Sequence, residues 1–174
     1  MPRAERPAMS DYGVPDHLDG LLEWRWAEQR LVANRNYWLV TASAGGRPHA
    51  MPVWGVWMPH TERFWFSCSP NARKLRNLAA NPQATVTVED TVEAISVEGR
   101  ARRVDPAHAS AADTAAVDAM VDAYLAKYWE DPAVHAEMAA FLRAHAIVEV
   151  TPERAFGIVE REEEFAERAT RWVW

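Results

Sequence analysis

The segment 67–76 holds the densest group of side chains that could do chemistry in this sequence. Two hydroxyl residues and three cations lie within it: Ser67, Ser69, Arg73, Lys74 and Arg76. Arginine grips a phosphate with a fork of N–H groups, lysine adds a point charge, and the free amides of a helix N-terminus attract the same anions. The segment therefore predicts a phosphate site. The alternative is a solvated basic face, which is common on helices.

Other kinds of catalytic centre find no support in the residue pattern. The six histidines show no pair at the helical spacing of a metal site, and the single cysteine, Cys68, leaves no cysteine pair for one. The Walker loop, Gly-x-Ser-x-Gly and Gly-x-Gly-x-x-Gly are absent. A passive small residue is the favoured role for Cys68. We assign no metal ligand and no catalytic residue from the sequence.

Composition limits the partners and the compartment. A net charge of −6 at pH 7 repels a phosphate backbone, which argues against nucleic acid as a partner. One cysteine fits a reducing compartment, the N-terminus lacks the apolar run of a signal peptide, and no apolar run approaches the roughly 20 residues that span a bilayer. We expect a cytoplasmic protein without a membrane partner, with residues 1–14 as a flexible arm and 15–174 as a single domain.

Hydrophobic periodicity and turn residues predict the elements that position the cationic segment. We expect a helix over 16–34 and strands over 37–41, 48–58 and 63–67. Ser69 is expected to cap a helix that has Pro70 at its first position and runs to residue 80. Strands over 83–89 and 94–104, helices from 105 and 131, strands over 146–150 and 155–159 and an extended tail complete the chain.

These elements favour a mainly β, α+β fold, in which an antiparallel meander closes toward a barrel with flanking helices. Pro48 and Pro52 lack ladder donors, so their strand is expected at an edge, where free backbone groups could meet a ligand. A plain bent edge strand explains the same feature. The nine tryptophans suit core and interface packing, or a flat wall for a planar ligand.

Several short motifs then appear in a consistent order: YWLVT at 37–41, GRPHAMPVW at 46–54, FWFS at 64–67, RKLRNL at 73–78, NP at 81–82 and VEGRA at 97–101. Together they resemble the split β-barrel flavin and deazaflavin oxidoreductases of the pyridoxamine-phosphate-oxidase-like superfamily. YLAKY at 124–128 and ATRW at 169–172 resemble its F420-dependent, actinobacterial-type branch. The tail Arg171-Trp172-Val173-Trp174 departs from the Arg-x-His ending of pyridoxamine phosphate oxidases, so that activity is not expected.

The resemblance implies a homodimer with two cofactor sites at the subunit interface. It also assigns roles to individual residues. The ring of the cofactor is lined by His49, Ala50, Met51, Pro52, Val53 and Trp54. Phe66 and Ser67 meet the ring and the ribityl chain, and Arg73 and Lys74 hold the phosphate. Trp172 reaches the cofactor from the partner subunit.

The function implied by the resemblance is that of an oxidoreductase that uses the deazaflavin F420 for hydride transfer to a flat, conjugated substrate, quinone-like or biliverdin-like. The first alternative is an oxidoreductase of the same fold that uses FMN. The second is a non-catalytic protein that binds a flavin or heme, with His49 as the first candidate for an axial heme ligand. The acidic tail of F420 favours an open groove with spare cations, and Arg76 lies one turn beyond Arg73.

Overall fold

The computed structural model describes residues 1–105 and 107–174. Within this part of the chain, nine strands form one antiparallel sheet: β1 (Arg3–Glu5), β2 (Asn36–Ala42), β3 (Pro48–Trp54), β4 (Val56–Met58), β5 (Arg63–Cys68), β6 (Gln83–Val88), β7 (Glu93–Val104), β8 (Ala146–Val159) and β9 (Thr170–Val173). The helices are α1 (Trp24–Ala33), α2 (Arg73–Ala80), α3 (Ala111–Tyr128), α4 (His135–Ala144) and α5 (Phe165–Arg168), with short 3-10 turns at Ser10–Tyr12 and Pro132–Val134.

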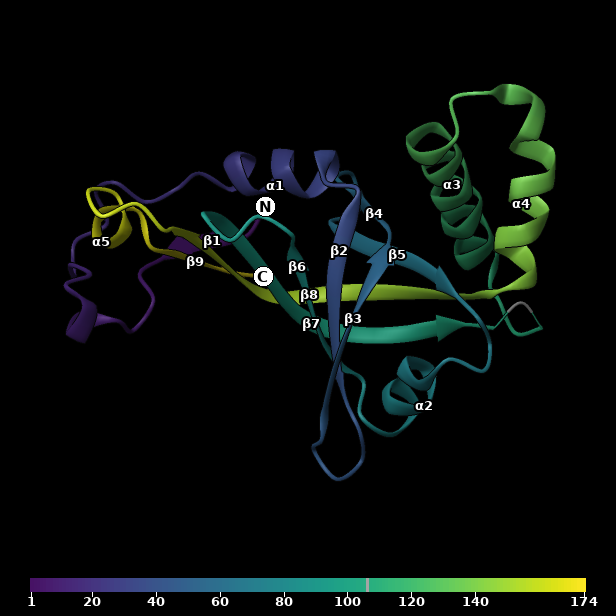
Figure 1. The fold of residues 1–174 in the computed structure, drawn as a ribbon, viewed down its shortest axis with the longest axis horizontal. Coiled ribbons are helices and arrows are strands. Elements are labelled where there is room, and N and C mark those ends of the chain that lie inside the picture. Colours follow the sequence, from purple (N-terminus) through teal and green to yellow (C-terminus); the bar gives the residue numbers. More distant parts are fainter. Residues whose placement is uncertain (106) are drawn as a thin grey trace.

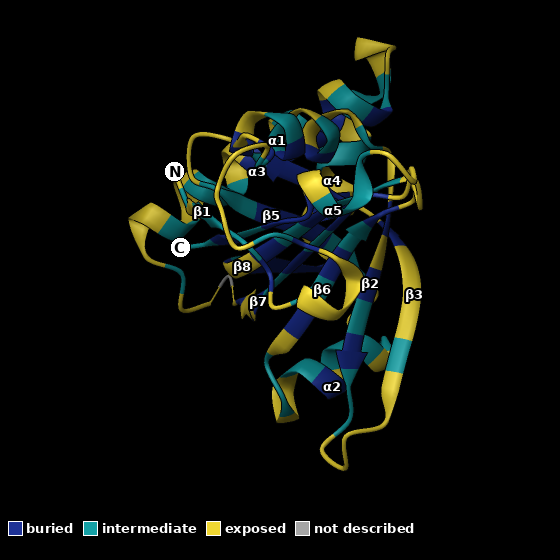
Figure 2. Cartoon of the chain, turned by 90° about the vertical axis from the view of Figure 1, so that its left-hand side faces the viewer, coloured by how far each residue is buried: buried dark blue, intermediate teal, exposed yellow. Residues whose placement is uncertain are grey.

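The sheet is an antiparallel split barrel, as the sequence predicts. Its main path runs β1-β9-β8-β7-β6-β2-β3, and the β4–β5 hairpin joins through β8, so the strands do not close into a ring. In Figure 1, α1 lies above the sheet, α3 and α4 form a layer at one end, and α2 lies below, beside the turn end of the β2–β3 hairpin. Figure 2 shows β3 as a mostly exposed edge strand, which confirms the expectation drawn from its two prolines.

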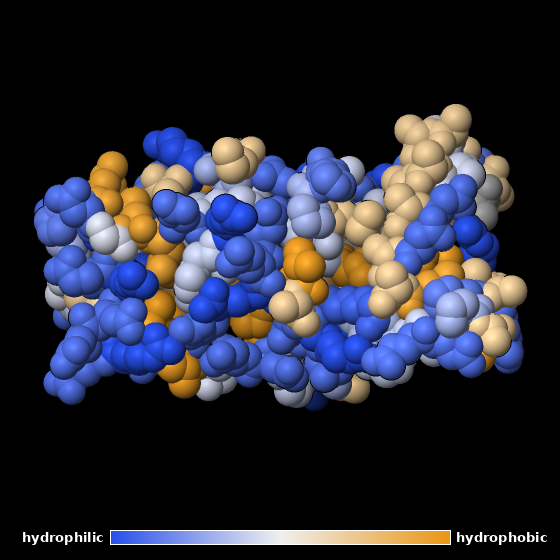
Figure 3. All heavy atoms as spheres, turned by 90° about the horizontal axis from the view of Figure 1, so that it is seen from above, coloured by the Kyte–Doolittle hydropathy of each residue, from blue (hydrophilic) through white to orange (hydrophobic). Residues whose placement is uncertain are grey.

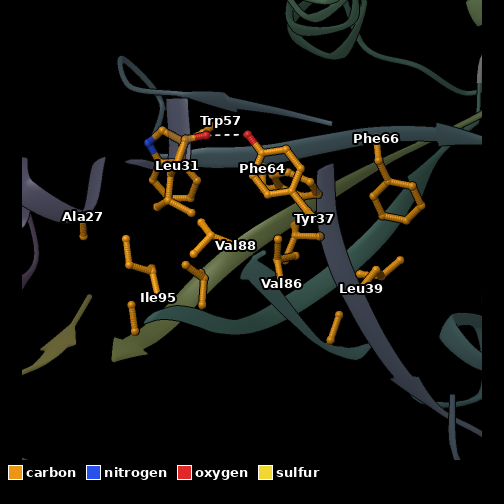
Figure 4. Close-up of a cluster of buried hydrophobic side chains, with 14 of the residues drawn as sticks. Ala27, Leu31, Tyr37, Leu39, Trp57, Phe64, Phe66, Val86, Val88 and Ile95 are labelled. Carbon is orange, nitrogen blue, oxygen red and sulfur yellow. Dashed lines mark hydrogen bonds between the residues drawn. The ribbon is translucent and has the colours of Figure 1, made fainter. Parts of the chain in front are cut away.

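The barrel core forms where strand alternation turns every second side chain inward. Tyr37 and Leu39 of β2 meet Val86 of β6 and the rings of Phe64 and Phe66 from β5 (Figure 4). The Tyr37 hydroxyl is buried and donates to the carbonyl of Leu31, which joins α1 to this core.

The intervening residues of the β4–β5 hairpin face a second core under the helices. Trp65 and Val56 pack there with Met120 and Tyr124 of α3 and with Leu142 of α4. The hairpin therefore separates the barrel from the α3–α4 layer, and the end of β5 emerges between the two. This placement brings the predicted phosphate segment close to the helices.

Two predicted helix starts are wrong. α1 begins at Trp24, not at residue 16, because Gly20 has a φ of +83° and a Cβ there would lie 2.8 Å from the carbonyl oxygen of Glu167. Ser69 does not cap α2: its carbonyl accepts from the amide of Ala72 at 2.9 Å, in a turn that places Pro70 at the second position. Serine and proline favour those two turn positions as strongly as a helix start.

Two strands also differ from the expectation. The strand predicted over 48–58 is divided at Gly55, where a Cβ would lie 2.2 Å from the ring of Phe64. The two strands predicted over 146–150 and 155–159 are one, β8. A register shift opposite Glu98 and Gly99 of β7 leaves Glu153 of β8 unpaired, next to Pro152. The start predicted for the helix at 105–106 involves Pro106, which lies outside the described residues; α3 begins at Ala111 with a capping box from Ser110.

The first fourteen residues do not extend freely from the domain. β1 pairs with β9, and the Arg6 guanidinium donates to the carbonyls of Glu167 at 2.8 Å and Ala169 at 3.0 Å. Residues 3–5 of the expected arm thus form an edge strand of the sheet. None of the described helices combines the length and apolarity needed to cross a membrane.

Candidate functional site

A cleft of about 330 Å³ opens between edge strand β3, the end of β5 and the α3–α4 layer. Its lining includes six residues that the sequence analysis assigns to a cofactor: Pro52, Val53, Trp54, Ser67, Ser69 and Lys74. They come from β3, β5, the turn after β5 and α2. The fold thus brings together the proposed ring-binding strand and the proposed phosphate segment. We call this space the cofactor cleft.

One end of the cofactor cleft carries hydroxyl groups and positive charge. Ser67 and Ser69 flank Cys68, and Lys74 reaches the same point from the first turn of α2. Burial raises the pKa of the Cys68 thiol, while the nearby charges of Lys74 and Arg103 oppose that rise. The thiol therefore stays protonated and passive, and the two cations beside it favour an anion.

Arg103 is a residue that the sequence analysis missed. It is exposed on β7 and comes near Cys68 only because β7 and β5 both pair with β8. Sequence spacing gives no indication of this, since 35 positions separate the two residues. Arg103 lines a neighbouring cavity beside α2 and not the cofactor cleft itself, so its charge acts on the anion end from outside.

Arg73 and Arg76 lie on α2 outside the cofactor cleft, and both are exposed. Arg76 donates to the carbonyl of Asn71 at 2.8 Å, and so braces the turn that precedes the helix. The residue at the N-cap, Ala72, offers no side-chain acceptor to the first turn of α2. The amide of Leu75 donates to the carbonyl of Ala72 at 3.1 Å, which leaves the amides of Arg73 and Lys74 for an anion.

Aromatic rings form another part of the lining. Trp54 stacks on Tyr128 at the end of α3, with ring centroids 4.8 Å apart and planes 8° from parallel. Trp129 meets the edge of Trp54 at 6.1 Å. The Tyr124 hydroxyl donates to the Trp54 carbonyl at 2.5 Å, and burial raises the pKa of this tyrosine, so the phenol remains a donor.

The helical contribution to the lining is what the sequence analysis missed most. It consists of Tyr124, Trp129, Phe141, Leu142 and His145. The spacing of apolar residues in α3 and α4 predicts one core-facing side on each helix. Some residues of the same sides lie beyond the edge of the core and line the cleft. The only sequence clue is the aromatic cluster that ends α3, Tyr124-Leu125-Ala126-Lys127-Tyr128-Trp129.

Besides Arg73 and Arg76, five of the predicted cofactor residues lie outside the cofactor cleft. His49, Ala50 and Met51 precede it on β3, and the Nδ1 atom of His49 is buried with no partner among the described residues. Phe66 is fully buried in the barrel core. Trp172 is fully buried as well, 5.4 Å from the ring of Trp24, so contact with a cofactor would require its indole to leave the core.

The lining defines what the cofactor cleft can hold. Aromatic and aliphatic walls suit a flat ring, and hydroxyls with cations at one end suit an attached phosphate. None of the described lining residues is acidic. No group of three or more His, Cys, Asp or Glu side chains that could hold a metal ion occurs among the described residues.

Comparisons with solved structures identify the same architecture. Similar folds occur in a conserved hypothetical protein of Mycobacterium tuberculosis, Rv2991 (TM-score 0.64, 17% identity, 80% of this chain and 86% of that one), and in an FAD-binding protein of Mesorhizobium loti (0.58, 19%, 88% and 96%). HutZ, a heme storage protein of Vibrio cholerae, is also similar (0.56, 20%, 76% and 90%). Among curated protein sequences, none matches this chain.

The family itself follows from the sequence of the barrel. The model of the pyridoxamine 5'-phosphate oxidase family matches residues 27–158, which extend from α1 almost to the end of β8 and include every element that lines the cofactor cleft. The antiparallel sheet that does not close, with its flanking helices, agrees with that match. This chain therefore belongs to the pyridoxamine 5'-phosphate oxidase family.

Proposed function

We propose that this protein is an oxidoreductase that binds a flavin-type cofactor in the cofactor cleft and that its cofactor is the deazaflavin F420. The supporting observation is the composition of the cleft, whose lining combines the aromatic side chains of Trp54 and Trp129 with the anion end made by Ser67, Ser69 and Lys74. A planar ring that carries a phosphate through a short polyol matches this combination. The similarity to an FAD-binding protein is consistent with this chemistry.

The residues present fit such a group in size and polarity. The volume of about 330 Å³ lies at the lower end of the roughly 300–1,000 Å³ typical of ligand pockets. The ring and the start of its side chain therefore fill the cleft, and any longer tail lies outside it. Bound there, the cofactor supplies hydride chemistry, while the protein orients the ring and excludes water from one face.

The choice of F420 over FMN depends on the cations outside the cleft. FMN ends in one phosphate, which the anion end satisfies. F420 continues into a long acidic tail, and Arg73 and Arg76 are exposed on α2 beyond Lys74. In a protein of net negative charge, this basic cluster gives a local positive potential, which favours binding of an anionic ligand.

A homodimer completes the proposal. The outer face of the sheet next to the cofactor cleft carries apolar residues on β2 and β3 beside threonines on β6: Trp38 pairs with Pro52 and Thr87, and Val40 pairs with Ala50 and Thr85. Trp38 is 46% exposed there. A second copy on this face would bury the indole and cover the open side of the cleft, with an interface above about 1,000 Å².

The test is a titration of tryptophan fluorescence with F420 and with FMN. A ring stacked near Trp54 and Trp129 quenches their emission. We expect F420 to bind at least about tenfold more tightly than FMN, a difference of about 1.4 kcal/mol, and this preference to shrink as salt screens the exposed arginines. Tighter binding of FMN, or a preference that salt does not change, would assign FMN to the site.

Heme binding is the second candidate. The buried, unpartnered Nδ1 of His49 is the observation that favours it, together with the similarity to a heme storage protein. An axial ligand must present a nitrogen to the iron, and the buried Nδ1 leaves only Nε2 of this ring for that role. A Soret band on addition of hemin that His49→Ala abolishes would support heme. Unchanged hemin spectra in the two proteins would exclude His49 as the ligand.

A further inference from the structure

A second cavity lies against the same helices as the cofactor cleft. Its volume is about 250 Å³, and its walls come from the end of β7, the N-terminal half of α3, the end of α4 and the start of β8: Val104, Ala109, Thr114, Val117, Arg143 and Ile147. We call it the apolar chamber. His145 lines the apolar chamber and the cofactor cleft, so one imidazole ring is common to both spaces.

The position of His145 is fixed by the backbone around it. It follows α4 and precedes β8, and its amide donates to the carbonyl of Leu142 at 3.2 Å. Its Nδ1 lies 2.7 Å from the carbonyl oxygen of Phe141, and the two rings pack with centroids 4.2 Å apart. Because a carbonyl can only accept, Nδ1 carries the proton. No hydrogen bond among the described residues uses Nε2, which is therefore available to a ligand.

We propose that the apolar chamber is the substrate subsite beside the cofactor cleft and that it takes a single-ring conjugated carbonyl compound, a substituted benzoquinone, whose oxygen contacts Nε2 of His145. This proposal rests on the proposed function of the cleft. Val104, Val117 and Ile147 supply the walls for the ring. Nε2 donates to a carbonyl oxygen when the imidazole is protonated and accepts from a hydroxyl when it is neutral, so it can hold the quinone and the hydroquinone.

The size of the apolar chamber favours a quinone-like substrate over a biliverdin-like one. An apolar cavity of about 150 Å³ is enough to bind benzene. The chamber, at about 250 Å³, has room for one ring with several small substituents and lies below the usual range for drug-sized ligands, which begins near 300 Å³. A whole tetrapyrrole does not fit. Figure 3 shows hydrophobic residues at the surface of the end that holds α3 and α4, and a second group at the opposite end.

Binding of tetramethyl-1,4-benzoquinone to the cofactor-free protein, measured by calorimetry, tests the proposal. All ring positions of this probe are methylated, so it does not add to Cys68. Val117→Trp fills the apolar chamber and is expected to weaken binding at least about tenfold. Val32→Trp, on the exposed side of α1, is the matched control and should bind as the wild type does. If Val117→Trp unfolds at a lower temperature than the wild type, Thr114→Trp serves as the second variant. Thr114 is exposed on the first turn of α3 and lines the same chamber.

A pair of substitutions at His145 tests the contact with the ligand. Asparagine keeps a polar group near the position of Nδ1, and glutamine keeps one near Nε2. We expect His145→Asn to weaken binding of the probe by about threefold to tenfold and His145→Gln to preserve it. If His145 acted only through its hydrogen bond to the Phe141 carbonyl, His145→Gln would weaken binding and His145→Asn would preserve it. Equal affinity in wild type, Val117→Trp and Thr114→Trp would overturn the proposal.

Ser69→Trp separates this inference from the proposed function, because it obstructs the cofactor cleft and leaves the apolar chamber open. It should abolish F420 and FMN binding and spare the quinone probe. Loss of the probe in Ser69→Trp, with normal binding in Val117→Trp, would place the quinone in the cleft and refute the chamber. If neither cofactor binds the wild type but Val117→Trp still weakens the probe, the function of the cleft fails and the chamber stands as a ligand site.

Discussion

Trp54 of β3 and Tyr128 of α3 stack almost in parallel, with centroids 4.8 Å apart and an angle of 8° between their planes. The tyrosine is buried, whereas the indole is 51% exposed. The Tyr128 hydroxyl donates to the carbonyl of Arg35 at 2.6 Å and accepts from the amide of Gly55 at 2.9 Å. The stack thus fixes the end of an edge strand to the helical layer and presents the other side of the indole to the cofactor cleft.

Trp54→Ala should therefore affect stability and binding separately. Loss of the stack is expected to lower the free energy of unfolding by about 0.5–1.5 kcal/mol, the range for aromatic pairs beyond area burial. Flavin affinity should fall as well, because one wall of the cofactor cleft is removed. Trp26→Ala, half-buried on α1 and remote from the cleft lining, is the control. Urea unfolding and flavin titration measure the two effects, and equal flavin affinity in Trp54→Ala and wild type would contradict the second.

Lys74→Ala should weaken cofactor binding without loss of stability. A charge-assisted hydrogen bond to phosphate contributes about 1.5–3 kcal/mol, which corresponds to a roughly tenfold to hundredfold rise in Kd. Lys74 forms no ion pair among the described residues, so the fold should lose little. Arg25→Ala, on the exposed side of α1, removes the same charge away from the cleft. Similar losses in the two variants would indicate a general charge effect and not a phosphate contact.

The parts of the fold that the sequence predicts are those set by local pattern. Alternation over 83–88 identifies β6 because each inward residue is buried in the barrel. The two prolines of β3 identify an edge strand because they remove ladder donors. The start of α2 is different: Ser69 and Pro70 fit a helix cap and a turn equally well, and the structure has the turn, closed by the Ala72 amide on the Ser69 carbonyl.

The parts of the site that the sequence misses come from elements remote along the chain. Lys74 and Ser67 are close in sequence, so the cationic pattern finds them. Arg103 joins them only through the pairing of β7 and β5 with β8. His145 reaches the cofactor cleft because α4 ends against β5 and β8, a contact that helical periodicity does not specify. Trp172 resembles a family motif but is fully buried in this chain's own core.

Trp38→Lys should yield a monomer. The indole is 46% exposed on the outer sheet face, and a lysine at the same position places a charge in the centre of the proposed interface. Sedimentation at micromolar concentration should show a dimer for the wild type and a monomer for the variant. Val32→Lys introduces the same charge on α1, where the side chain is 43% exposed, and should remain dimeric. A wild type that sediments only as a monomer would refute the homodimer.

Lys127 predicts an unusual alkaline dependence of stability. Its ammonium group donates to the Tyr37 hydroxyl at 2.7 Å and to the Gly55 carbonyl at 3.3 Å, and it lies 5.7 Å from the ring of Tyr128. No carboxylate pairs with it among the described residues. Burial, and secondarily the charge of Arg35, lowers the pKa of Lys127 from 10.5 to about 8. The folded state therefore releases this proton at a lower pH than the unfolded chain does.

Between about pH 8 and pH 10.5 the unfolded chain holds more protons at this position than the folded one, so the contribution of Lys127 to stability must rise with pH in that window. Solvent screening of a partly buried amine reduces the gain to on the order of 1 kcal/mol. Lys127→Met keeps the aliphatic stem and removes the titration. The difference in free energy of unfolding between wild type and Lys127→Met, measured in urea from pH 7 to pH 10, should increasingly favour the wild type. A difference that stays constant with pH would show that the lysine titrates as it does in water.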